Sequence, residues 1–437
     1  MSNPELRRNL WLELTPHRLV GMPLILAVIF LLLYILDDYR FADGVANGAV
    51  GLYTLLAVLW GTRQAAETII SEIRDHTWDS QRMSVVGPWS MTLGKLFGST
   101  IYPWYGGLLC LAVYAAAAPT HEVPLTESLL ILLGIALFSQ SVALLASLQA
   151  IRKDRRYSRS QAAAFLILGL GLGLPLLSLA FEGNQSILWY GIPVDLTDLA
   201  LLSLYAFLGW AVIGVARLLR SELQMKSTPL VWCAFVLFAM VYVAGFFNAG
   251  SEDLPLPLLH LYAALVVGVT LTYGMAFSER KDPVAFHRLL QACARRNWRD
   301  FWLHLPLWGA TLPLVAIAVG GLLLRDLAGS APAGAGFSGV TAVAVFAFLL
   351  RDLALLLYLN LGRVPRRADM VAVLYLGLLY GVIPIIFATL DLDRLTLLFW
   401  PRWDMAPLPT VLAPVGELGL VAWLLIRRWQ TQHRRPG

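Results

Sequence analysis

Three ionisable residues lie inside long apolar stretches of the sequence, where a charge is costly and therefore marks a candidate functional site. Arg351 and Asp352 are adjacent within 336–361, and Glu417 lies within 409–426. Residues of these types can relay protons, contact a polar substrate, or pair with one another as a clamp between helices. We interpret them as a structural polar clamp, with a substrate contact and a proton relay as the alternatives.

A second group of candidates lies in the polar stretch 71–95, SEIRDHTWDSQRMSVVGPWSMTLGK. It predicts a polar helix that begins near Glu72, a break at Gly87-Pro88 and a return into the membrane after Lys95. A nucleotide-binding P-loop would need GxxxxGK[ST], but the nearest string, GPWSMTLGKL, has the wrong spacing and ends in Leu96. The sequence also lacks HExxH zinc sites, GxSxG nucleophile elbows and paired-cysteine ligand sets. We expect no metal site.

These residues must be positioned by membrane-spanning helices, because the composition does not fit a soluble protein. Of the 437 residues 58% are hydrophobic and only 14% are charged, whereas about 25% is usual for charged residues in soluble domains. The apolar stretches are long enough to cross the roughly 30 Å of hydrocarbon in a bilayer as helices. We therefore predict an all-α, polytopic integral membrane protein of about twelve transmembrane helices. The spans are predicted near 19–36, 45–64, 98–118, 127–150, 162–181, 198–219, 229–248, 256–277, 303–324, 336–361, 370–388 and 409–426.

Lysine and arginine are distributed unevenly over the predicted loops. If residue 1 is cytoplasmic, the seven cytoplasmic segments carry 28 of the 33 Lys and Arg residues, as the positive-inside rule requires. We therefore expect a multi-pass protein of the inner (plasma) membrane with both termini in the cytoplasm. Because membrane insertion and lipid contact explain the net charge of +5, we expect membrane lipid and no nucleic acid as partners.

The sequence repeats itself at a nearly constant offset. LRRNLWLELTP at 6–16 aligns with LRSELQMKSTP at 219–229, and Ser71-Glu72 aligns with Ser278-Glu279. Together with glycines and prolines of later spans, these matches keep the same order at offsets between 207 and 213. We interpret them as a duplication into two parallel six-helix repeats, with a transport path expected at their interface. The predicted halves are residues 1–220 and 221–437.

The repeat also pairs polar residues in the fourth span of each half. Gln140, beside Ser141, corresponds to Arg351 at an offset of 211. Both halves are therefore expected to place polar groups at the same depth in the membrane. These residues join Asp352 and Glu417 as intramembrane candidates.

The stretch 71–95 resembles the first cytoplasmic loop of type 2 ABC exporter permeases. That loop has a Glu, a Gly-Thr-x-Glu core, a Ser/Thr-Pro turn and a closing Gly-Lys. The corresponding residues here are Glu72, Thr77, Asp79, Pro88, Gly94 and Lys95. The sequence departs from the family pattern at three positions, since His76 replaces Gly, Asp79 replaces Glu and Gly87 replaces Ser/Thr.

Two further features agree with this resemblance. The family has an amphipathic interfacial helix before the first span, and residues 4–16 carry leucines at i, i+4 and i+8 from Leu6. The alternative for this segment is a basic flank that anchors the first span. The family also has short re-entrant helices outside, between the fifth and sixth spans of each half. The aromatic, proline-containing segments 186–195 and 396–405 occupy these positions.

The resemblance implies that segment 70–95 contains a coupling helix that docks on a separate ATPase, and that 278–302 is its equivalent in the second half. The candidate coupling residues are Glu72, Thr77, Asp79, Pro88, Lys95, Glu279, Arg288 and Arg296. The second loop is more basic, and contact with anionic lipid headgroups is the alternative for it. The resemblance implies two copies of a separately encoded ABC ATPase, which would bind ATP and Mg²⁺, with no cofactor in this chain.

By this resemblance the chain is a transport subunit and not an enzyme. It would export or flip an amphipathic or hydrophobic substrate, driven by ATP hydrolysis on the partner. A six-plus-six secondary carrier driven by an ion gradient is one alternative, and an intramembrane enzyme is another. The carrier fits less well, because the loop after the second span lacks the Gly-x4-Asp-Arg-x-Gly-Arg-Arg-like pattern of major facilitator proteins and the junction at 220–228 is short.

Overall fold

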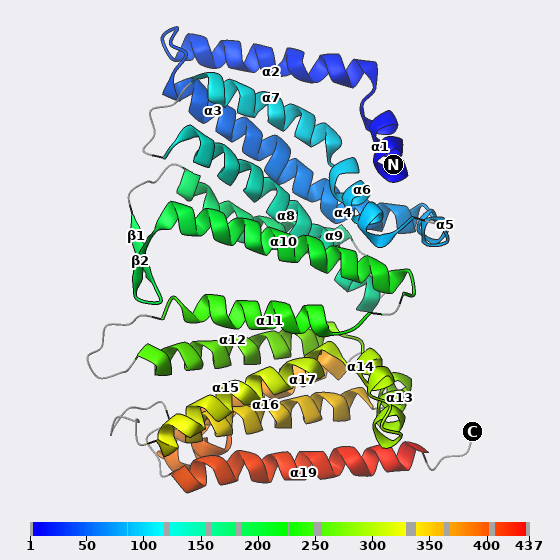
Figure 1. The fold of residues 1–437 in the computed structure, drawn as a ribbon, viewed down its shortest axis with the longest axis vertical. Coiled ribbons are helices and arrows are strands. Elements are labelled where there is room, and N and C mark those ends of the chain that lie inside the picture. Colours follow the sequence, from blue (N-terminus) through cyan, green and yellow to red (C-terminus); the bar gives the residue numbers. More distant parts are fainter. Residues whose placement is uncertain are drawn as a thin grey trace. The chain divides into compact units, whose positions relative to one another are not determined.

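The computed structural model describes residues 3–84, 86–117, 123–153, 159–180, 185–225, 227–247, 256–328, 338–361, 368–401 and 407–433. By their contacts these residues form two compact units, each built almost entirely of helices (Figure 1). Unit 1 comprises Met1–Ile187 and Pro193–Ser227. Unit 2 comprises Leu188–Ile192 and Thr228–Gly437.

Unit 1 begins with a short helix, continues through apolar helical segments joined by polar elements, and ends with one long helix. Its elements are α1 (Pro4–Glu13), α2 (Pro16–Leu36), α3 (Asp43–Tyr53), the π-helix η1 (Thr54–Trp60), α4 (Gly61–Arg74), α5 (Trp78–Arg82), α6 (Pro88–Gly98), α7 (Ile101–Ala117), α8 (Leu125–Lys153), α9 (Arg159–Gly173), the 3-10 helix η2 (Leu174–Ala180) and α10 (Leu196–Glu222). Strands β1 (Ser186–Trp189) and β2 (Ile192–Asp195) precede α10.

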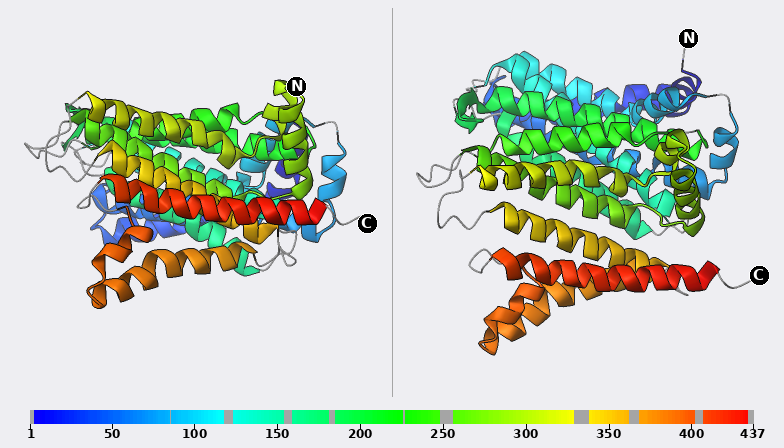
Figure 2. Two further views of the ribbon diagram at one scale, coloured as in Figure 1. Left: turned by 90° about the horizontal axis from the view of Figure 1, so that it is seen from below. Right: turned by 60° about the horizontal axis from the view of Figure 1, so that its bottom comes forward.

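Unit 2 has a similar succession of elements. They are α11 (Leu230–Ala244), α12 (Leu256–Ser278), α13 (Pro283–Ala294), α14 (Trp298–His304), α15 (Leu307–Leu327), α16 (Gly339–Asn360), α17 (Ala368–Gly377), the π-helix η4 (Leu378–Val382), α18 (Ile383–Thr389), the 3-10 helix η5 (Asp393–Leu398) and α19 (Pro407–His433). The span formed by α17, η4 and α18 bends away from α19 (Figure 2, orange and red). This span is mostly exposed.

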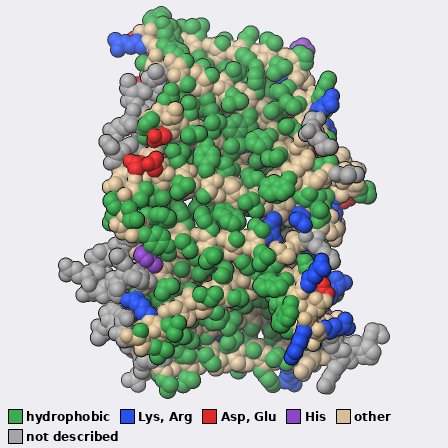
Figure 3. All heavy atoms as spheres, in the orientation of Figure 1, with side chains coloured by type: hydrophobic (Ala, Val, Ile, Leu, Met, Phe, Trp, Pro, Cys, Tyr) green, Lys and Arg blue, Asp and Glu red, His purple; other side chains and the backbone are tan. Residues whose placement is uncertain are grey.

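Nine helices of the described residues are long and apolar enough to cross a membrane, and the bent pair α6–α7 adds a tenth if it is counted as one span. Two shorter apolar helices, Ala163–Leu177 and Leu230–Ala244, lie at the predicted fifth and seventh spans. On the face shown in Figure 3, the surface over the helices is covered by hydrophobic side chains, as a lipid-facing surface requires. The chain is therefore an all-α, multi-pass membrane protein, which confirms the prediction from composition.

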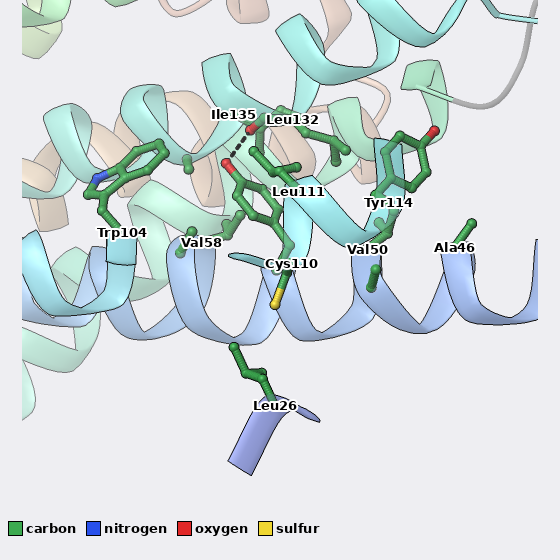
Figure 4. Close-up of a cluster of buried hydrophobic side chains, with 14 of the residues drawn as sticks. Leu26, Ala46, Val50, Val58, Trp104, Cys110, Leu111, Tyr114, Leu132 and Ile135 are labelled. Atoms are coloured by element: carbon green, nitrogen blue, oxygen red, sulfur yellow. Dashed lines mark hydrogen bonds between the residues drawn. The ribbon is translucent and has the colours of Figure 1, made fainter. Parts of the chain in front are cut away.

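The core of unit 1 forms around α8, which packs against α4, α9 and α10. A buried cluster joins α2, α3, α7 and α8, with side chains such as Leu26, Cys110 and Ile135 pointing into it (Figure 4). Within it the Tyr53 hydroxyl donates a hydrogen bond of 2.9 Å to the Leu132 carbonyl, drawn dashed in Figure 4. The buried phenol is thus satisfied and contributes its ring to apolar packing.

The core of unit 2 forms around α16, which packs against α12, α15, α17 and α19. Its buried cluster includes Val315, Leu322, Leu349 and Leu356. Of the nine candidate spans, α8 and α16 are the most buried. Each is the fourth span of a predicted half, and the polar residues Gln140 on α8 and Arg351 on α16 are buried inside their units.

The segment between the fifth and sixth predicted spans of the first half is a β-hairpin and not a re-entrant helix, which corrects the prediction. Strands β1 and β2 are joined by Tyr190 and Gly191, whose φ angles are 51° and 77°. Two successive residues with positive φ match the right-handed twist of paired strands, so they favour a two-residue hairpin turn. In the second half the 3-10 helix η5 stands at this position, and residues 402–406 lie outside the described part.

The helix that forms the second predicted span, 45–64, extends beyond the apolar residues of that span. Helix α4 continues to Arg74, so Glu72 lies in its last turn, and the separate polar helix begins at Trp78 and not near Glu72. The amphipathic character of residues 61–74 explains the extension, since Ala65, Ile69 and other residues on one face are buried while the polar face is exposed. The predicted break at Gly87-Pro88 is confirmed, because Pro88 begins α6.

Candidate functional site

A buried cation joins four helices at the end of unit 1 where α1, α5 and α6 lie (Figure 1). The side chain of Lys95, on α6, is fully buried; its Nζ lies 3.0 Å from a Glu5 carboxylate oxygen and pairs with the carboxylate of Glu72. It donates to Gln81 Oε1 at 2.9 Å, and Gln81 Nε2 donates to Glu72 at 2.9 Å. The ammonium also lies 5.1 Å from the centre of the Trp78 ring. We call these five residues the Lys95 network.

The Lys95 network holds one positive and two negative charges with little access to water. The Glu5 side chain is 9% exposed and the Glu72 side chain 13%. Burial raises the pKa of the Glu5 carboxyl above its ordinary value, and the nearby ammonium opposes this shift. A buried ion pair adds little net stability, but removal of one partner costs about 3–5 kcal/mol because a charge is left unpaired. The network therefore specifies how α1, α4, α5 and α6 meet.

Two glycines let α1 lie directly on α6. A Cβ atom on Gly94 would lie 2.8 Å from Glu5 Cβ, and one on Gly98 would lie 2.5 Å from Asn9 Nδ2. Glu5 and Asn9 are four residues apart on α1, as are the glycines on α6, so the two helices meet along matching faces. The Asn3 side chain accepts from the Glu5 amide at the start of α1 and donates to the Ser90 carbonyl at 2.6 Å. The predicted interfacial helix is thus docked against the loop that carries the coupling candidates.

Helix α5 is the exposed element that this network holds. Trp78 is buried, whereas the Asp79 side chain is 82% exposed. Arg82 donates to the Glu222 carbonyl at 3.1 Å, which attaches α5 to the end of α10. The Thr77 hydroxyl donates to the Glu72 carbonyl at 3.2 Å and closes the turn between α4 and α5. The predicted residues Glu72, Thr77 and Lys95 are therefore brought together, while Asp79 faces solvent.

The turn before α5 has a counterpart in unit 2. His76, which stands where the resembled family has Gly, adopts φ 56°, in the left-handed region that favours glycine. Arg296 adopts φ 53° before α14. Each is followed by one residue and then by the Trp that begins the next helix, Trp78 or Trp298. The two loops thus end a helix and start another with the same local backbone.

The loop of unit 2 otherwise differs from that of unit 1. Glu279 accepts from the Leu307 amide at 2.9 Å, so it caps the start of α15. Arg288 on α13 and Arg296 after it are exposed. Lys and Arg side chains gather at this end of unit 2 (Figure 3), among exposed apolar side chains such as Val284 and Trp298. This pattern suits either an anionic membrane surface or a protein partner.

The buried polar side chains on the fourth predicted span of unit 1, Gln140 and Ser141, are uncharged. Gln140 is fully buried on α8; its Nε2 donates to the Ala57 carbonyl at 2.8 Å, and its Oε1 accepts from Trp104 Nε1 at 3.0 Å. Ala57 lies in the π-helix η1, whose widened turn frees backbone carbonyls for such bonds. Ser141 is buried beside it, and its hydroxyl has no hydrogen-bond partner among the described residues. Gln140 therefore clamps α8 to the second and third predicted spans.

The buried polar side chains on the fourth predicted span of unit 2, Arg351 and Asp352, are charged. Arg351 on α16 donates to Asp352 Oδ1 through Nε at 2.9 Å and lies within 2.8 Å of it through Nη2. Arg351 Nη1 pairs with the carboxylate of Glu417 on α19. Arg351 and Asp352 are almost completely buried, and Glu417 is 26% exposed. The clamp interpretation is supported, since these contacts join α16 and α19 inside the unit.

Two tyrosines complete this charged cluster. The hydroxyls of Tyr273, on α12, and Tyr380, in η4, each donate to Asp352 Oδ2 at 2.6 Å. Tyr380 also accepts from Arg351 Nη2 at 3.0 Å. We call these two tyrosines with Arg351, Asp352 and Glu417 the Arg351 cluster. It carries one positive and two negative side chains, so its formal charge is −1.

A groove of about 420 Å³ lies beside the Arg351 cluster. Its walls come from α12, α16, the span with η4, and Pro401, and they are almost entirely apolar. Tyr273 and Tyr380 of the cluster form part of these walls. The volume is within the range of roughly 300–1,000 Å³ that is usual for small-molecule sites.

Sequence reasoning missed several members of both clusters. Glu5 and Gln81 are polar residues in polar segments, which gives no signal for a buried contact. Tyr273 and Tyr380 resemble interfacial aromatics by composition alone. A usable signal for Tyr380 was its place beside Gly377 and Gly381, since glycines allow local changes of helix geometry. Among the described residues no group of three or more His, Cys, Asp and Glu side chains is arranged to hold a metal ion.

The site thus belongs to a multi-pass helical membrane protein in which the described residues of each unit include a buried charge network. No protein-family model, curated protein or solved structure matches the chain.

Proposed function

We propose that the chain is the transmembrane permease of an ABC exporter, with two six-span halves fused in one polypeptide. It would move an amphipathic or hydrophobic substrate across the inner membrane, with two copies of a separate ATPase bound on the cytoplasmic side. The observation that carries this proposal is the exposed helix α5, held to α1, α4 and α6 by the buried Lys95 network. Because segment 70–95 resembles the coupling loop of ABC exporter permeases, the proposed partner is an ABC ATPase.

The geometry supports transmission of a push on α5. Glu72 lies at the end of the second predicted span, and Lys95 lies on the helix that leads into the third. Because a buried and fully bonded network is stiff, displacement of α5 would carry both spans with it. The second unit would receive the partner through α13, α14 and the turn between them, where Arg288 on α13 and Arg296 in the turn are exposed. ATP hydrolysis on the partner would supply the energy for this movement.

Charge reversal on the exposed face of α5 tests the proposal. Purified protein in nanodiscs is mixed in turn with the ABC ATPases of the same organism, and binding and ATP hydrolysis are measured. Asp79→Arg should weaken binding at least about tenfold, because an exposed charge at an interface sets both attraction and selectivity. The matched control Asp198→Arg changes an exposed carboxylate at the opposite end of unit 1 and should bind as wild type. Equal binding by Asp79→Arg, or no binding by wild type, would contradict the proposal.

An ion-gradient-driven carrier is the second candidate, and the Arg351 cluster favours it. Buried carboxylates paired with an arginine are typical of proton and ion pathways in membrane proteins. In proteoliposomes without any ATPase, such a carrier would show substrate-dependent proton flux that Glu417→Gln abolishes. An exporter permease should show no such flux without ATP and its partner.

A further inference from the structure

The groove beside the Arg351 cluster has an aromatic wall backed by negative charge. Four of its lining residues are aromatic, namely Tyr273, Phe277, Phe348 and Tyr380. Two of these, Tyr273 and Tyr380, donate their hydroxyl hydrogens to Asp352. The carboxylate is 1% exposed, so it acts on the groove through the tyrosines and not by direct contact.

The balance of charge decides which ligand this groove favours. Arg351 lies over the rings of Phe348 and Tyr380, with Cζ 4.7 and 5.3 Å from their centres, so its positive charge is already partly compensated. Asp352 and Glu417 outnumber it, which leaves a formal charge of −1 in a region of low dielectric constant. A buried net charge is unfavourable unless a counter-charge is near.

We propose that this groove binds a hydrophobic organic monocation. Such a ligand would neutralise the Arg351 cluster, place its apolar groups against the aliphatic and aromatic walls, and present its charge to aromatic faces. An anion of the same size would meet the same apolar walls but the wrong charge. A proton would neutralise the cluster as well, but it would leave the aromatic groove without a role.

The π-helix η4 gives a separate reason to regard the groove as a built site. Tyr380 lies at the centre of η4, and π-helical turns within α-helices occur frequently at functional sites because they re-aim side chains. Trp400 Nε1 donates to the Tyr380 carbonyl at 3.0 Å, which satisfies the backbone at this irregular turn. Tyr380 is therefore held by its carbonyl on one side and by Asp352 on the other.

The groove also distinguishes the two halves. Position 140, which matches Arg351 in the predicted repeat, is a glutamine bonded to the uncharged groups of Trp104 and the Ala57 carbonyl. The inference deepens the proposed function, because it names a substrate class and assigns its binding to the second half. It rests on the proposed function for transport, whereas binding itself needs no ATPase.

Binding of a lipophilic cation to the purified full chain tests the proposal. Tetraphenylphosphonium is the probe, and tetraphenylborate is an anion of nearly the same size and shape; both are measured by equilibrium dialysis in nanodiscs, with empty nanodiscs subtracted. We expect saturable binding of the phosphonium and at least about tenfold weaker binding of the borate. Glu417→Gln should weaken phosphonium binding roughly tenfold, because it removes the excess negative charge of the Arg351 cluster.

Two further variants separate charge from packing. Leu376→Trp fills the groove without changing any charge and should abolish saturable binding. Tyr375→Phe, on the same span but outside the groove lining, is the matched control and should bind as wild type. Equal or tighter binding of the borate, or wild-type binding by both Glu417→Gln and Leu376→Trp, would overturn the cation site. Failure of the ATPase to bind in the Asp79 experiment would instead overturn the exporter and leave the cation site standing.

Discussion

Replacement of Lys95 by methionine removes the only cation of the Lys95 network and keeps the length of the side chain. Glu5 and Glu72 then face each other with side chains 9% and 13% exposed. Since both carboxylates reach the same ammonium, they would lie about 5 Å apart and repel by roughly 3 kcal/mol at an effective dielectric constant near 20. This agrees with the cost of about 3–5 kcal/mol for breaking a buried pair.

The assay must report both local and global stability. Hydrogen exchange of peptides from α1 and α5 should lose protection in Lys95→Met, because these helices are held mainly by the network and have little core of their own. The thermal midpoint in detergent should fall by about 6–12 °C, if roughly 3 kcal/mol acts on a unit of this size. The double variant Lys95→Met/Glu72→Gln should recover more than half of the loss, because it no longer buries two carboxylates together.

A variant in an exposed pair gives the control for this experiment. Arg63→Met breaks the i,i+4 pair with Glu67 on α4, where the side chains are 65% and 48% exposed. Such an exposed pair contributes about 0.5 kcal/mol or less to the free energy of unfolding. If Lys95→Met perturbs α1 and α5 no more than Arg63→Met does, or if the double variant is as unstable as the sum of the single ones, the network does not hold these helices.

Two other predictions concern the titration of Glu5 and the backbone strain at His76 and Arg296. The folded-state pKa of Glu5 is raised above its ordinary 4.5, so its contribution to stability is fully present below that pH and is lost as pH rises through the raised value. Wild type should therefore lose thermal stability relative to Glu5→Gln as pH rises above 4.5, and a difference that grows in the opposite direction would refute this. His76→Gly relieves the positive φ of 56° and should raise the thermal midpoint by about 1–3 °C, as should Arg296→Gly at φ 53°. A lower midpoint for both glycine variants would show that these backbone turns are not strained.

Much of the architecture was readable because hydrophobic length is a local property. A stretch such as 256–277 must cross the membrane as a helix whatever its neighbours do, and the structure has α12 at Leu256–Ser278. Charged residues in such stretches were also recognisable. The free energy needed to place a charge in hydrocarbon is high whichever residue it later pairs with. Arg351, Asp352 and Glu417 were named for this reason, and they do lie in one cluster.

Local irregularities were harder to predict. The segment 186–195 suits a hairpin only because Tyr190 adopts φ 51° beside Gly191, and a tyrosine carries no strong preference for that conformation. The end of the second span was also missed, because amphipathic residues 61–74 continue a helix beyond the hydrocarbon without remaining apolar. The residue at which such a helix ends depends on which other parts of the protein cover each face of the helix.

The buried contacts themselves were decided by the tertiary structure. The sequence marked Glu72 and Lys95 as separate candidates, but only the packing of α1 on Gly94 and Gly98 buries them together and adds Glu5 as a third charge. Likewise Tyr380, which lies in a π-helical turn of another span, meets Asp352 only in the folded unit. Hydropathy and spacing predict which charged residues lie within the membrane. Which of these charges meet depends on packing, because residues far apart in the chain exclude the solvent and bring the side chains together.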